Sequence, residues 1–417
     1  MKKTLFRFSS LILVMSLVVS LGVFMTGCGG NNSGNKQIKV TFWEEDDPGN
    51  VDPVWDEIIK DFEAQNENIK VVRTHVTIES LRQNFQNAVI GGGGPSLIAC
   101  PDDNIGLFGT AKTAKQLDDV FSKEFLDTID NKLLEGAKLG GELYGIPYIT
   151  GNTVALLYNK DIIKEAPETM SELIEKSKQF MKDTDKKGLV FNMTAPYNYI
   201  GFLGGFGGKV FDENDNITLN TAEMKKTVEY LYSLRGEHGI VPAECDYNQA
   251  SNLFKTGDAA FIINGPWAFE EYKKAGINLG ITCIPKIDDA DYPTPYMSSK
   301  VLMLNGNLKG EQLDATRKFV EFVCNKENQL KIVPAINEFP TNIEAIQEVD
   351  SLGIDDLTQL KEQVDKCVPM PIIPKMRAVW DGITPTFQKV WSGKIQPTEA
   401  IREMQNAAME KAKALGE

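Results

Sequence analysis

An alternation of strand and helix patterns over residues 38–100 is the feature that most constrains how this chain can fold. Three short apolar runs, at residues 38–43, 69–72 and 96–100, indicate buried strands. The segments between them carry apolar residues at helical spacing: Val54, Ile58, Ile59 and Phe62 in the first, and Leu81, Phe85, Ala88 and Val89 in the second. Because a helix that crosses over between two strands joins them in parallel, this order predicts an α/β fold with a largely parallel sheet and helices on both faces.

Turn residues predict where these helices begin and end. Asp52-Pro53 combines a residue preferred at the N-cap with a proline preferred in the first turn, so we expect the first helix to start there. The run of glycines at residues 91–94, followed by Pro95, ends the second helix and leads into a strand. A phosphate-binding loop has the opposite order, since it leaves a strand and opens a helix. The glycine run therefore predicts a turn and no nucleotide site.

Polar residues follow two of the predicted strands. In parallel sheets, ligands bind beyond the carboxyl ends of the strands. The first end carries Trp43-Glu44-Glu45-Asp46-Asp47 and the third carries Pro101-Asp102-Asp103-Asn104. Carboxylates accept hydrogen bonds from hydroxyl groups, so Glu45, Asp47 and Asp103 are candidate ligand contacts, with Trp43 beside them. A solvated acidic turn at residues 44–47 is the alternative.

A second candidate is the aromatic turn at residues 263–269. Trp267 follows the turn Gly265-Pro266 at the end of a predicted strand, where a flat apolar ring can face a cleft. This layout favours a binding wall over a reaction centre. The alternative is that Trp267 fills a gap in the core.

The amino terminus has the organisation of a secretory signal. Lys2, Lys3 and Arg7 precede an apolar segment, and Met25-Thr26-Gly27-Cys28 closes it. Residues 1–27 resemble a bacterial lipoprotein signal, which implies that lipid is attached to Cys28 and that cleavage leaves this residue first. A plain secretory signal and a single membrane anchor are the alternatives. Residues 28–36 are glycine-rich and polar, which predicts a flexible tether.

Composition narrows the classes of function. The chain has 417 residues, which is long for one domain, so two domains are expected. Its net charge of −14 would repel nucleic acid, and none is expected as a partner. Five cysteines follow Cys28 without Cys-x-x-Cys spacing, so free thiols are expected. The two histidines, His75 and His238, are not spaced as metal ligands or as part of a triad, and we expect no metal, no other cofactor and no catalytic residues.

Six strings of residues carry a resemblance to a known family. They lie at residues 94–98, 145–148, 156–161, 191–197, 263–269 and 370–380. From about Lys39 to the last predicted helix, the chain resembles maltodextrin-binding proteins, the family 1 extracellular solute-binding subunits of carbohydrate importers of the ATP-binding-cassette (ABC) type. The resemblance implies a two-lobed periplasmic-binding-protein-like fold of type II. Its lobes are discontinuous, hinge strands join them, and sugar lies in the cleft between them.

The resemblance also implies boundaries for the lobes. We expect an amino-terminal lobe of residues 37–149 plus 300–345, and a carboxyl-terminal lobe of residues 150–299 plus 346–417. A long helical segment closes the second lobe, with apolar residues at helical spacing: Val379, Ile383, Phe387 and Val390, then Ile401, Met404 and Ala408. Pro385 should interrupt or kink that segment.

Site residues follow from the resemblance position by position. The family's aromatic platforms match Tyr197, Trp267 and Trp380, its cleft tyrosine matches Tyr247, and its hydroxyl-binding aspartates match Asp47 and Asp103. This agrees with the chemistry of a sugar, whose C–H faces stack on rings while its hydroxyl groups need polar partners. Several polar positions differ from the family pattern: Cys100 replaces a tryptophan, Asn104 an arginine, Pro48 a lysine, and Asn152 and Ala195 two glutamates. Asn152 is kept as a candidate contact.

The implied function is that of a lipid-anchored, extracellular sugar-binding subunit of an ABC importer, which is not an enzyme. We expect a monomer on the outer face of a Gram-positive cell membrane, with permease subunits and a neutral oligosaccharide as partners. An α-1,4-linked glucan is the first choice. The alternatives are cellodextrins, laminari-oligosaccharides or another sugar, a ligand sensor for a surface kinase, and a glycosidase, which would need two carboxylates about 5 to 10 Å apart.

Overall fold

The computed structural model describes residues 37–46, 48–182 and 184–416, and the account that follows concerns these residues. From Gln37 onward the chain forms one compact unit. The predicted signal, the tether, the lipidation site Cys28 and the candidate contact Asp47 lie outside the described residues.

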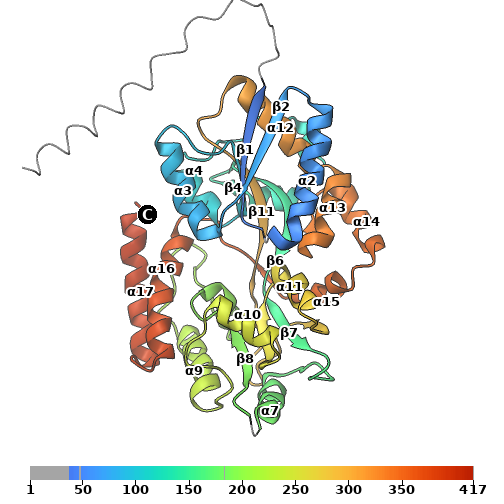
Figure 1. The fold of residues 1–417 in the computed structure, drawn as a ribbon. Coiled ribbons are helices and arrows are strands. Elements are labelled where there is room, and N and C mark those ends of the chain that lie inside the picture. Colours follow the sequence, from blue (N-terminus) through green and yellow to red (C-terminus); the bar gives the residue numbers. More distant parts are fainter. Residues whose placement is uncertain (1–36, 47, 183, 417) are drawn as a thin grey trace, which may run out of the picture. The chain divides into compact units, whose positions relative to one another are not determined.

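Two sheets organise this part of the chain (Figure 1). The larger has the strand order β12-β6-β11-β3-β1-β2, with β13 beside β11, and the smaller has the order β10-β7-β9-β8. The larger sheet consists of β1 (Ile38–Glu44), β2 (Ile69–His75), β3 (Leu97–Pro101), β6 (Ile146–Asn152), β11 (Tyr296–Leu304), β12 (Phe339–Pro340) and β13 (Val368–Pro369). The smaller consists of β7 (Ala155–Asn159), β8 (Lys187–Phe191), β9 (Ala259–Asn264) and β10 (Leu279–Thr282), and β4 (Lys138–Leu139) pairs with β5 (Glu142–Leu143).

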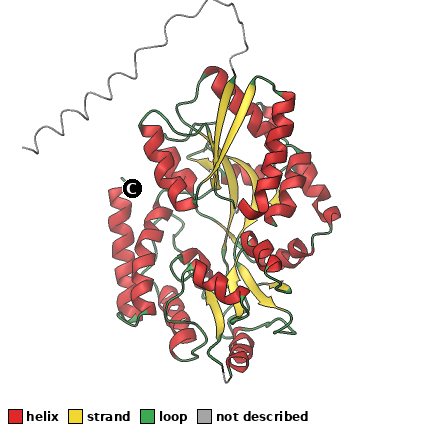
Figure 2. Cartoon of the chain, in the orientation of Figure 1, coloured by secondary structure: helices red, strands yellow, loops and turns green. Residues whose placement is uncertain are grey.

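Helices cover the sheets on more than one side (Figure 2). Those associated with the larger sheet are α2 (Pro48–Gln65), α3 (Ile78–Ile90), α4 (Asn104–Thr110), α5 (Lys123–Leu126), α6 (Asn131–Gly136), α12 (Gly310–Val323), α13 (Lys326–Ile336) and α14 (Ile343–Glu348). The remainder are α7 (Met170–Met181), α8 (Gly201–Gly205), α9 (Ala222–Gly236), α10 (Tyr247–Lys255), α11 (Phe269–Lys274), α15 (Asp355–Val364), α16 (Lys375–Trp391) and α17 (Pro397–Ala414). Short 3-10 turns lie at η1 (Pro196–Asn198), η2 (Pro266–Ala268) and η3 (Val349–Leu352).

The predicted alternation of strands and helices is confirmed, but the larger sheet is mixed. β1 pairs in parallel with both β2 and β3, as helical crossovers require. β11 runs antiparallel to β3 and to β6, and β12 runs antiparallel to β6. In the larger sheet, the prediction of parallel pairing therefore holds for the first three strands and for β13 beside β11, and not for the other pairs. The reason is that β11 enters the sheet directly from the region of the smaller sheet, without a helical crossover from a neighbouring strand.

The first helix begins earlier than Asp52, where the sequence predicted its N-cap. α2 starts at Pro48 and contains Pro53. A proline has no N–H for the carbonyl four residues before it, so the Gly49 carbonyl receives no helical bond from Pro53. Lys274 of α11 supplies a donor instead, with its Nζ 3.1 Å from the Gly49 oxygen and 2.7 Å from Asn50 Oδ1. The start of α2 is thus held by a residue far away in the sequence.

Two hydrophobic cores divide the described chain. One is built by buried residues between Val40 and Ile149 and between Val301 and Ile336, together with Val349 and Leu357. The other is built by residues between Val154 and Ile287, then Leu360, and then residues between Met370 and Ala408. We call these the first and the second core. The boundaries of the two predicted lobes stay a prediction, because residues from Gln37 onward form a single compact unit.

The carboxyl-terminal helices complete the second core. All seven residues predicted to line them are buried: Val379, Ile383, Phe387, Val390, Ile401, Met404 and Ala408. α16 runs without a break through Pro385, so the predicted interruption is wrong. Apolar residues on both sides of the proline pack into the same core and hold the two halves in one helix. Gly382 lets α17 approach closely, since a Cβ atom there would lie 2.7 Å from the Ala408 nitrogen.

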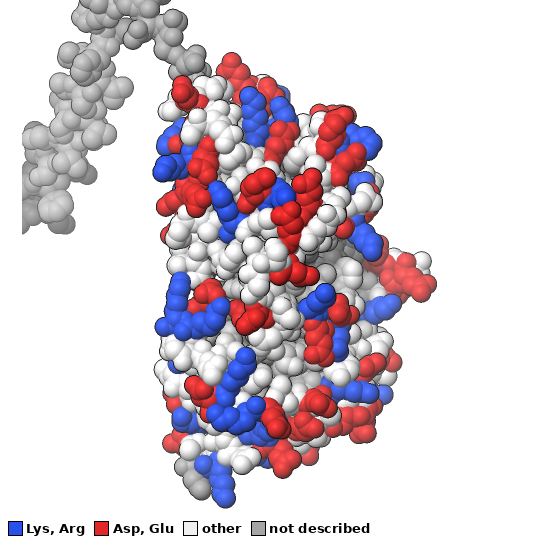
Figure 3. Space-filling view, turned by 90° about the vertical axis from the view of Figure 1, so that its right-hand side faces the viewer, with Lys and Arg blue, Asp and Glu red and all other residues white. Residues whose placement is uncertain are grey.

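Acidic and basic side chains alternate over the face shown in Figure 3, and no continuous basic surface forms there. Among the described residues, no helix combines the length and apolar character needed to cross a membrane. The five described cysteines are unpaired: Cys100, Cys245, Cys283 and Cys324 are buried, and Cys367 is half-buried.

Candidate functional site

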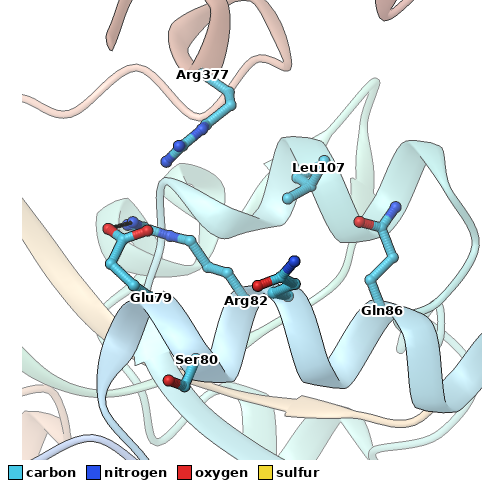
Figure 4. A pocket seen from close by; sticks show the side chains of 7 residues that line it. Glu79, Ser80, Arg82, Gln86, Leu107 and Arg377 are labelled. Carbon is cyan, nitrogen blue, oxygen red and sulfur yellow. Dashed lines mark hydrogen bonds and ion pairs between the residues drawn. The ribbon is translucent and has the colours of Figure 1, made fainter. Parts of the chain in front are cut away.

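A pocket of about 350 Å³ lies between α3, α4 and α16 (Figure 4). It is lined mainly by polar side chains: Glu79, Ser80, Arg82, Gln83, Gln86, Leu107 and Arg377. Figure 4 shows Arg377 reaching across the pocket towards the Glu79 end of α3. Since α3 and α4 belong to the first core and α16 to the second, both cores contribute to the pocket.

Arg82 connects the pocket to the predicted contact Asp103. Its guanidinium group donates to Glu79 at 2.7 Å, to Asn104 Oδ1 at 2.7 Å and to Asp103 Oδ2 at 3.2 Å. The planar guanidinium group can hold three acceptors at once because its donors point in fixed directions. Asp103 also accepts from Asn104 Nδ2 at 2.9 Å. The Asp103 carboxylate therefore has a fixed orientation at the end of β3.

Half-buried aromatic rings lie on the side of the second core. We call Tyr197, Trp267, Tyr296 and Trp380 the aromatic group. The rings of Tyr197 and Trp267 have centroids 6.4 Å apart, and those of Tyr296 and Trp380 are 6.1 Å apart. The Tyr197 hydroxyl lies 2.6 Å from the Asn152 carbonyl oxygen and 3.2 Å from that of Tyr296. The two ring pairs are thus joined where β6 and β11 leave the larger sheet.

Local sequence explains how these rings are placed. The Trp267 ring folds back onto Gly265, where a Cβ atom would lie 2.1 Å from the ring, so glycine is required at this position. Pro266 and Pro196 each open a 3-10 turn, which orients the aromatic residue that follows. Trp380 lies three residues after the pocket residue Arg377 on α16, and residues at this spacing are neighbours on a helix surface. The pocket and the aromatic group are therefore adjacent on this helix.

A group of buried charges lies on the side of the first core. We call Glu45, Asp46, Lys300 and Glu338 the Lys300 cluster. The Lys300 ammonium group hydrogen-bonds to Asp46 and lies 3.7 Å from Glu338 Oε1 and 3.8 Å from Glu45 Oε1. Tyr148 donates to Asp46 Oδ2 at 3.2 Å. Lys300, Asp46 and Glu338 are buried, while Glu45 keeps 17% of its side chain exposed.

Burial governs protonation in this region. It raises the pKa of Glu338 to about 8, and no described residue hydrogen-bonds to either of its carboxyl oxygens. Burial also raises the pKa of Asp102, whose Oδ2 accepts from the Ser299 backbone at 2.8 Å. Burial alone would lower the pKa of Lys300, but Asp46, Glu338 and Glu45 outweigh it and raise this pKa. Lys300 is therefore charged at neutral pH, while Glu338 is largely protonated.

The structure brings together only some of the residues predicted from the sequence. Tyr197, Trp267 and Trp380 belong to one aromatic group, Asp103 accepts from Arg82, and Glu45 lies 3.8 Å from Lys300. Asn152 uses its side-chain amide to donate to Ser298 Oγ at 2.8 Å, which gives it a role in joining β6 to β11. Trp43 packs against the first core. Tyr247 is half-buried at the start of α10, near Tyr272.

Sequence reasoning missed Arg82, Arg377, Lys300 and Glu338. A signal was available for Lys300, because it directly precedes the apolar run Val301-Leu302-Met303-Leu304 within a strand. A lysine in such a strand needs a buried carboxylate partner. Its partners are remote in sequence, with Asp46 lying 254 residues away, so the pattern does not reveal which carboxylates they are.

The arrangement suits a ligand that has both apolar faces and many hydroxyl groups. Aromatic rings supply stacking surface, while carboxylate, amide and guanidinium groups supply acceptors and donors. Among residues 37–46, 48–182 and 184–416, no group of three or more His, Cys, Asp or Glu side chains could hold a metal ion.

Comparison with known proteins shows which family has a similar sequence. Residues 57–361 match the family described as bacterial extracellular solute-binding protein. The galactooligosaccharide-binding protein of Bacillus subtilis is 26% identical over 96% of this chain and 97% of its own length. The maltooligosaccharide ABC transporter solute-binding lipoprotein of Streptococcus pneumoniae is 29% identical over 70% of each chain.

A solved structure shares both fold and sequence with this chain. The maltose/maltodextrin-binding domain from Bdellovibrio bacteriovorus, solved with maltotriose, has a TM-score of 0.84 and 32% identity, over 90% of this chain and all of that one. This likeness confirms the predicted α/β fold of the periplasmic-binding-protein type. The family match spans most of the described residues and agrees with the pocket that both cores line. The chain belongs to the bacterial extracellular solute-binding protein family.

Proposed function

We propose that this protein is the extracellular sugar-binding subunit of an ABC importer, which captures neutral oligosaccharides and delivers them to permease subunits. The observation that carries the proposal is the polar pocket between α3, α4 and α16, with Trp380 next to Arg377 on α16. A pyranose ring can stack its C–H face on an indole while its hydroxyl groups bond to Arg82, Gln83 and Gln86.

An α-1,4-linked glucan is the preferred ligand. Two observations support it: the Streptococcus pneumoniae relative is named for maltooligosaccharides, and the Bdellovibrio bacteriovorus domain was solved with maltotriose. A galactooligosaccharide is the second candidate, because the Bacillus subtilis relative named for it matches 96% of this chain. Both ligand classes are neutral chains of hexoses, which suits a pocket whose charged lining groups are all in ion pairs: Arg82 with Glu79 at 2.7 Å, and Arg377 with Asp381 at 2.9 Å.

Binding without catalysis is part of the proposal. Hydrolysis of a glycosidic bond needs two carboxyl groups on opposite sides of the bond. The described carboxylates in and beside the pocket are all ion-paired: Glu79 and Asp103 with Arg82 at 2.7 and 3.2 Å, and Glu45 with Lys300 at 3.8 Å. Relatives of this chain are also named as binding proteins. We therefore expect incubation with maltotriose to release no new reducing ends.

Calorimetry with four neutral trisaccharides tests the proposed ligand class. Maltotriose, cellotriose, laminaritriose and a galactotriose are titrated into the protein, with glucose and a trigalacturonate as comparisons. At least one neutral trisaccharide should bind with a Kd in the micromolar range or tighter, about −8 kcal/mol, and glucose should bind much more weakly. Tighter binding of the charged uronate than of every neutral sugar would contradict the proposal.

Anchoring through Cys28 is a separate part of the proposal. It rests on the sequence pattern of residues 1–28 and on the name of the Streptococcus pneumoniae relative, a lipoprotein. Cells fed a tagged palmitate should label the wild-type protein and not Cys28→Ser. A Cys28→Ser protein that keeps the label and stays in the membrane fraction would contradict the anchor.

A further inference from the structure

Lys300 is a buried lysine in the middle of an apolar strand. It lies on β11 between Pro101 of β3 and Ile149 of β6, and it is 4% exposed. The pairing of β11 with β6 shifts register between Lys300 and Val301, and irregularities of this kind re-aim side chains. A buried ammonium group is costly unless carboxylates surround it, so its surroundings indicate what it does.

The carboxylates around Lys300 come from two other segments of the chain. Glu45 and Asp46 directly follow β1, and Glu338 directly precedes β12. The ammonium group hydrogen-bonds to Asp46 and reaches Glu338 and Glu45 at 3.7 and 3.8 Å. One lysine therefore ties the ends of two strands to the middle of a third.

The turn after β1 is also held from its other side. The Asp46 backbone N–H donates to Glu44 Oε2 at 2.8 Å, and Arg73 Nε donates to Glu44 Oε1 at 3.0 Å. Glu45 lies between these two fixed neighbours, Glu44 and Asp46. Unlike them, it keeps part of its side chain exposed, and its 3.8 Å contact with Lys300 is longer than a hydrogen bond. The Glu45 carboxylate is thus held in place, but its oxygens are not used in a hydrogen bond to Lys300.

Glu45 is also linked to the pocket. The charged groups that act on it are Lys300 from β11, Asp46 from its own turn, Arg82 from α3 and His75 from β2. Arg82 lines the pocket and holds Asp103. Glu45 and Asp103 follow neighbouring parallel strands, and the charge of Arg82 acts on the Glu45 carboxylate while its guanidinium group bonds to Asp103.

We propose that Lys300 is a positioning residue for sugar binding: it fixes the turn of Glu45 and Asp46 and keeps the Glu45 carboxylate charged, so that this carboxylate accepts hydrogen bonds from ligand hydroxyl groups. The inference rests on the proposed function, since it names how one wall of that site is kept ready for a sugar.

Charge balance explains why one lysine is decisive. Burial raises the pKa of Glu45, Lys300 is the largest opposing influence, and Arg82 and His75 add to it. With Glu338 largely protonated at neutral pH, the Lys300 ammonium group has Asp46 and Glu45 as its other acidic neighbours. Without the ammonium group, burial and the neighbouring Asp46 would act on Glu45 with less opposition, and the pKa of Glu45 would rise further. Glu45 would then lose acceptor strength and its fixed direction.

A double-mutant cycle tests whether Lys300 acts through Glu45. Calorimetry with maltotriose at pH 7 compares wild type, Lys300→Met, Glu45→Gln and the double variant, each scaled to its folded fraction. We expect Lys300→Met and Glu45→Gln each to lose about tenfold or more in affinity, and the double variant to bind within about twofold of Glu45→Gln. Additive losses would overturn the inference.

Lys331→Met is the matched control. Lys331 of α13 also pairs with two carboxylates, at 2.8 Å from Glu57 and 3.0 Å from Asp61, but these side chains of α2 are exposed. Its replacement should change affinity by less than about twofold. Lys300→Gln, which keeps a donor but not the charge, takes the place of Lys300→Met in the cycle if that variant does not fold.

A pH scan gives a readout that a purely structural role would not move. It is made in a Glu338→Gln background, so that the titration of Glu338 does not contribute to the profile. Without Lys300, maltotriose affinity should rise with pH as Glu45 regains its charge, whereas with Lys300 present it should stay level. A level profile in both backgrounds would overturn the inference.

Nuclear magnetic resonance of the wild-type protein keeps the inference testable even if no Lys300 variant folds. Carboxyl carbons of glutamate are labelled, and the Glu45 signal is assigned with Glu45→Gln. The signal should report an ionised group at pH 7 and should shift on addition of maltotriose. A protonated Glu45, or one unmoved by a sugar that binds, overturns the inference alone. Wild type that binds none of the neutral trisaccharides overturns the proposed function and this inference with it.

Discussion

In the site that we propose, the aromatic group and the Lys300 cluster form two walls, and they are held in place by different physics. The rings of Tyr197, Trp267, Tyr296 and Trp380 are half-buried and pack against the second core. Lys300, Asp46 and Glu338 are almost wholly buried within the first core. A ring can be half exposed at little cost, whereas a buried charge is tolerated only together with its partners.

The difference predicts how each wall responds to substitution. A ring that faces ligand on one side and core on the other can be truncated while the core behind it remains. Removing one member of a buried charge group leaves the others without compensation and disturbs the whole set. The aromatic wall should therefore show large, separable losses of affinity, while the charged wall should show coupled effects and sensitivity to pH.

The largest expected effect separates two tryptophans of the same helix. Trp380 is half-buried in the aromatic group, and Trp391 is 3% exposed and packs against Phe191, Tyr199 and Phe387. Trp380→Ala should lose about 2 to 4 kcal/mol of binding free energy, or roughly 30- to 1000-fold in affinity, because an aromatic anchor is removed. Calorimetry with the best trisaccharide measures this loss, with affinity expressed per folded molecule.

Trp391→Ala is the matched control for Trp380→Ala. It should cost about 3 to 5 kcal/mol of unfolding free energy and leave the affinity of the folded protein unchanged. Urea unfolding followed by circular dichroism measures the stability of both variants. If Trp380→Ala instead unfolds the protein and spares affinity, Trp380 is a core residue, and the contrast between the two walls fails.

The next effect tests the charged wall through pH. Glu338 has a folded-state pKa of about 8, well above the usual value near 4.3 for an unfolded chain. Between these values the folded protein holds a proton that the unfolded chain has released, so this group lowers stability as pH rises, by on the order of 1 kcal/mol per pH unit. Glu338→Gln keeps the neutral form at every pH.

The variant and the wild type should therefore have similar unfolding free energies near pH 5, and the variant should become the more stable of the two towards pH 8. Urea titrations at several pH values measure the difference, in which the contributions of all other groups cancel. A difference that is constant with pH would show that Glu338 is ionised in the folded protein across this range.

Local patterns in the sequence predicted the elements and the aromatic residues better than the charged wall. The turn Gly265-Pro266-Trp267 carries its own signal, because glycine, proline and an aromatic residue lie next to one another. The apolar residues of α16 repeat at helical spacing, and they are buried as expected. Each of these features is decided within a few residues of the chain.

The Lys300 cluster could not be read in the same way. Lys300 belongs to a strand that crosses from one core to the other, and Asp46 lies 254 residues before it. No local rule states which carboxylate a buried lysine will meet, since the pairing is set by sheet order. The predicted start of α2 was wrong for a related reason. Lys274, from another part of the chain, donates to the Gly49 carbonyl, to which Pro53 cannot donate.

A third prediction concerns Asp103, where the charged wall meets the pocket. Asp103→Asn keeps one acceptor oxygen but loses the charge that faces Arg82 at 3.2 Å. We expect a loss of about 1 to 2 kcal/mol in trisaccharide binding, smaller than for Trp380→Ala. Asp127→Asn is the control, because Asp127 is an exposed surface residue that pairs with Lys123. The trisaccharide affinity of this variant should equal that of the wild type. Equal losses in the two variants would remove Asp103 from the site.

The smallest effect tests the junction of the aromatic group with the strands that cross between the cores. Tyr197→Phe keeps the ring beside Trp267 and removes the hydroxyl that lies 2.6 Å from the Asn152 carbonyl. One hydrogen bond is worth about 0.5 to 1.5 kcal/mol, so the unfolding free energy should fall by this amount. Affinity should change by less than about threefold, because the stacking surface remains.

Tyr230→Phe is the control, since no described residue hydrogen-bonds to the buried Tyr230 hydroxyl. Removal of this hydroxyl should leave the unfolding free energy unchanged or raise it slightly. If Tyr197→Phe leaves stability unchanged but abolishes binding, the hydroxyl contacts the ligand directly. The aromatic wall would then bind sugar through hydrogen bonds as well as stacking, and the contrast with the Lys300 cluster would be weaker than we propose.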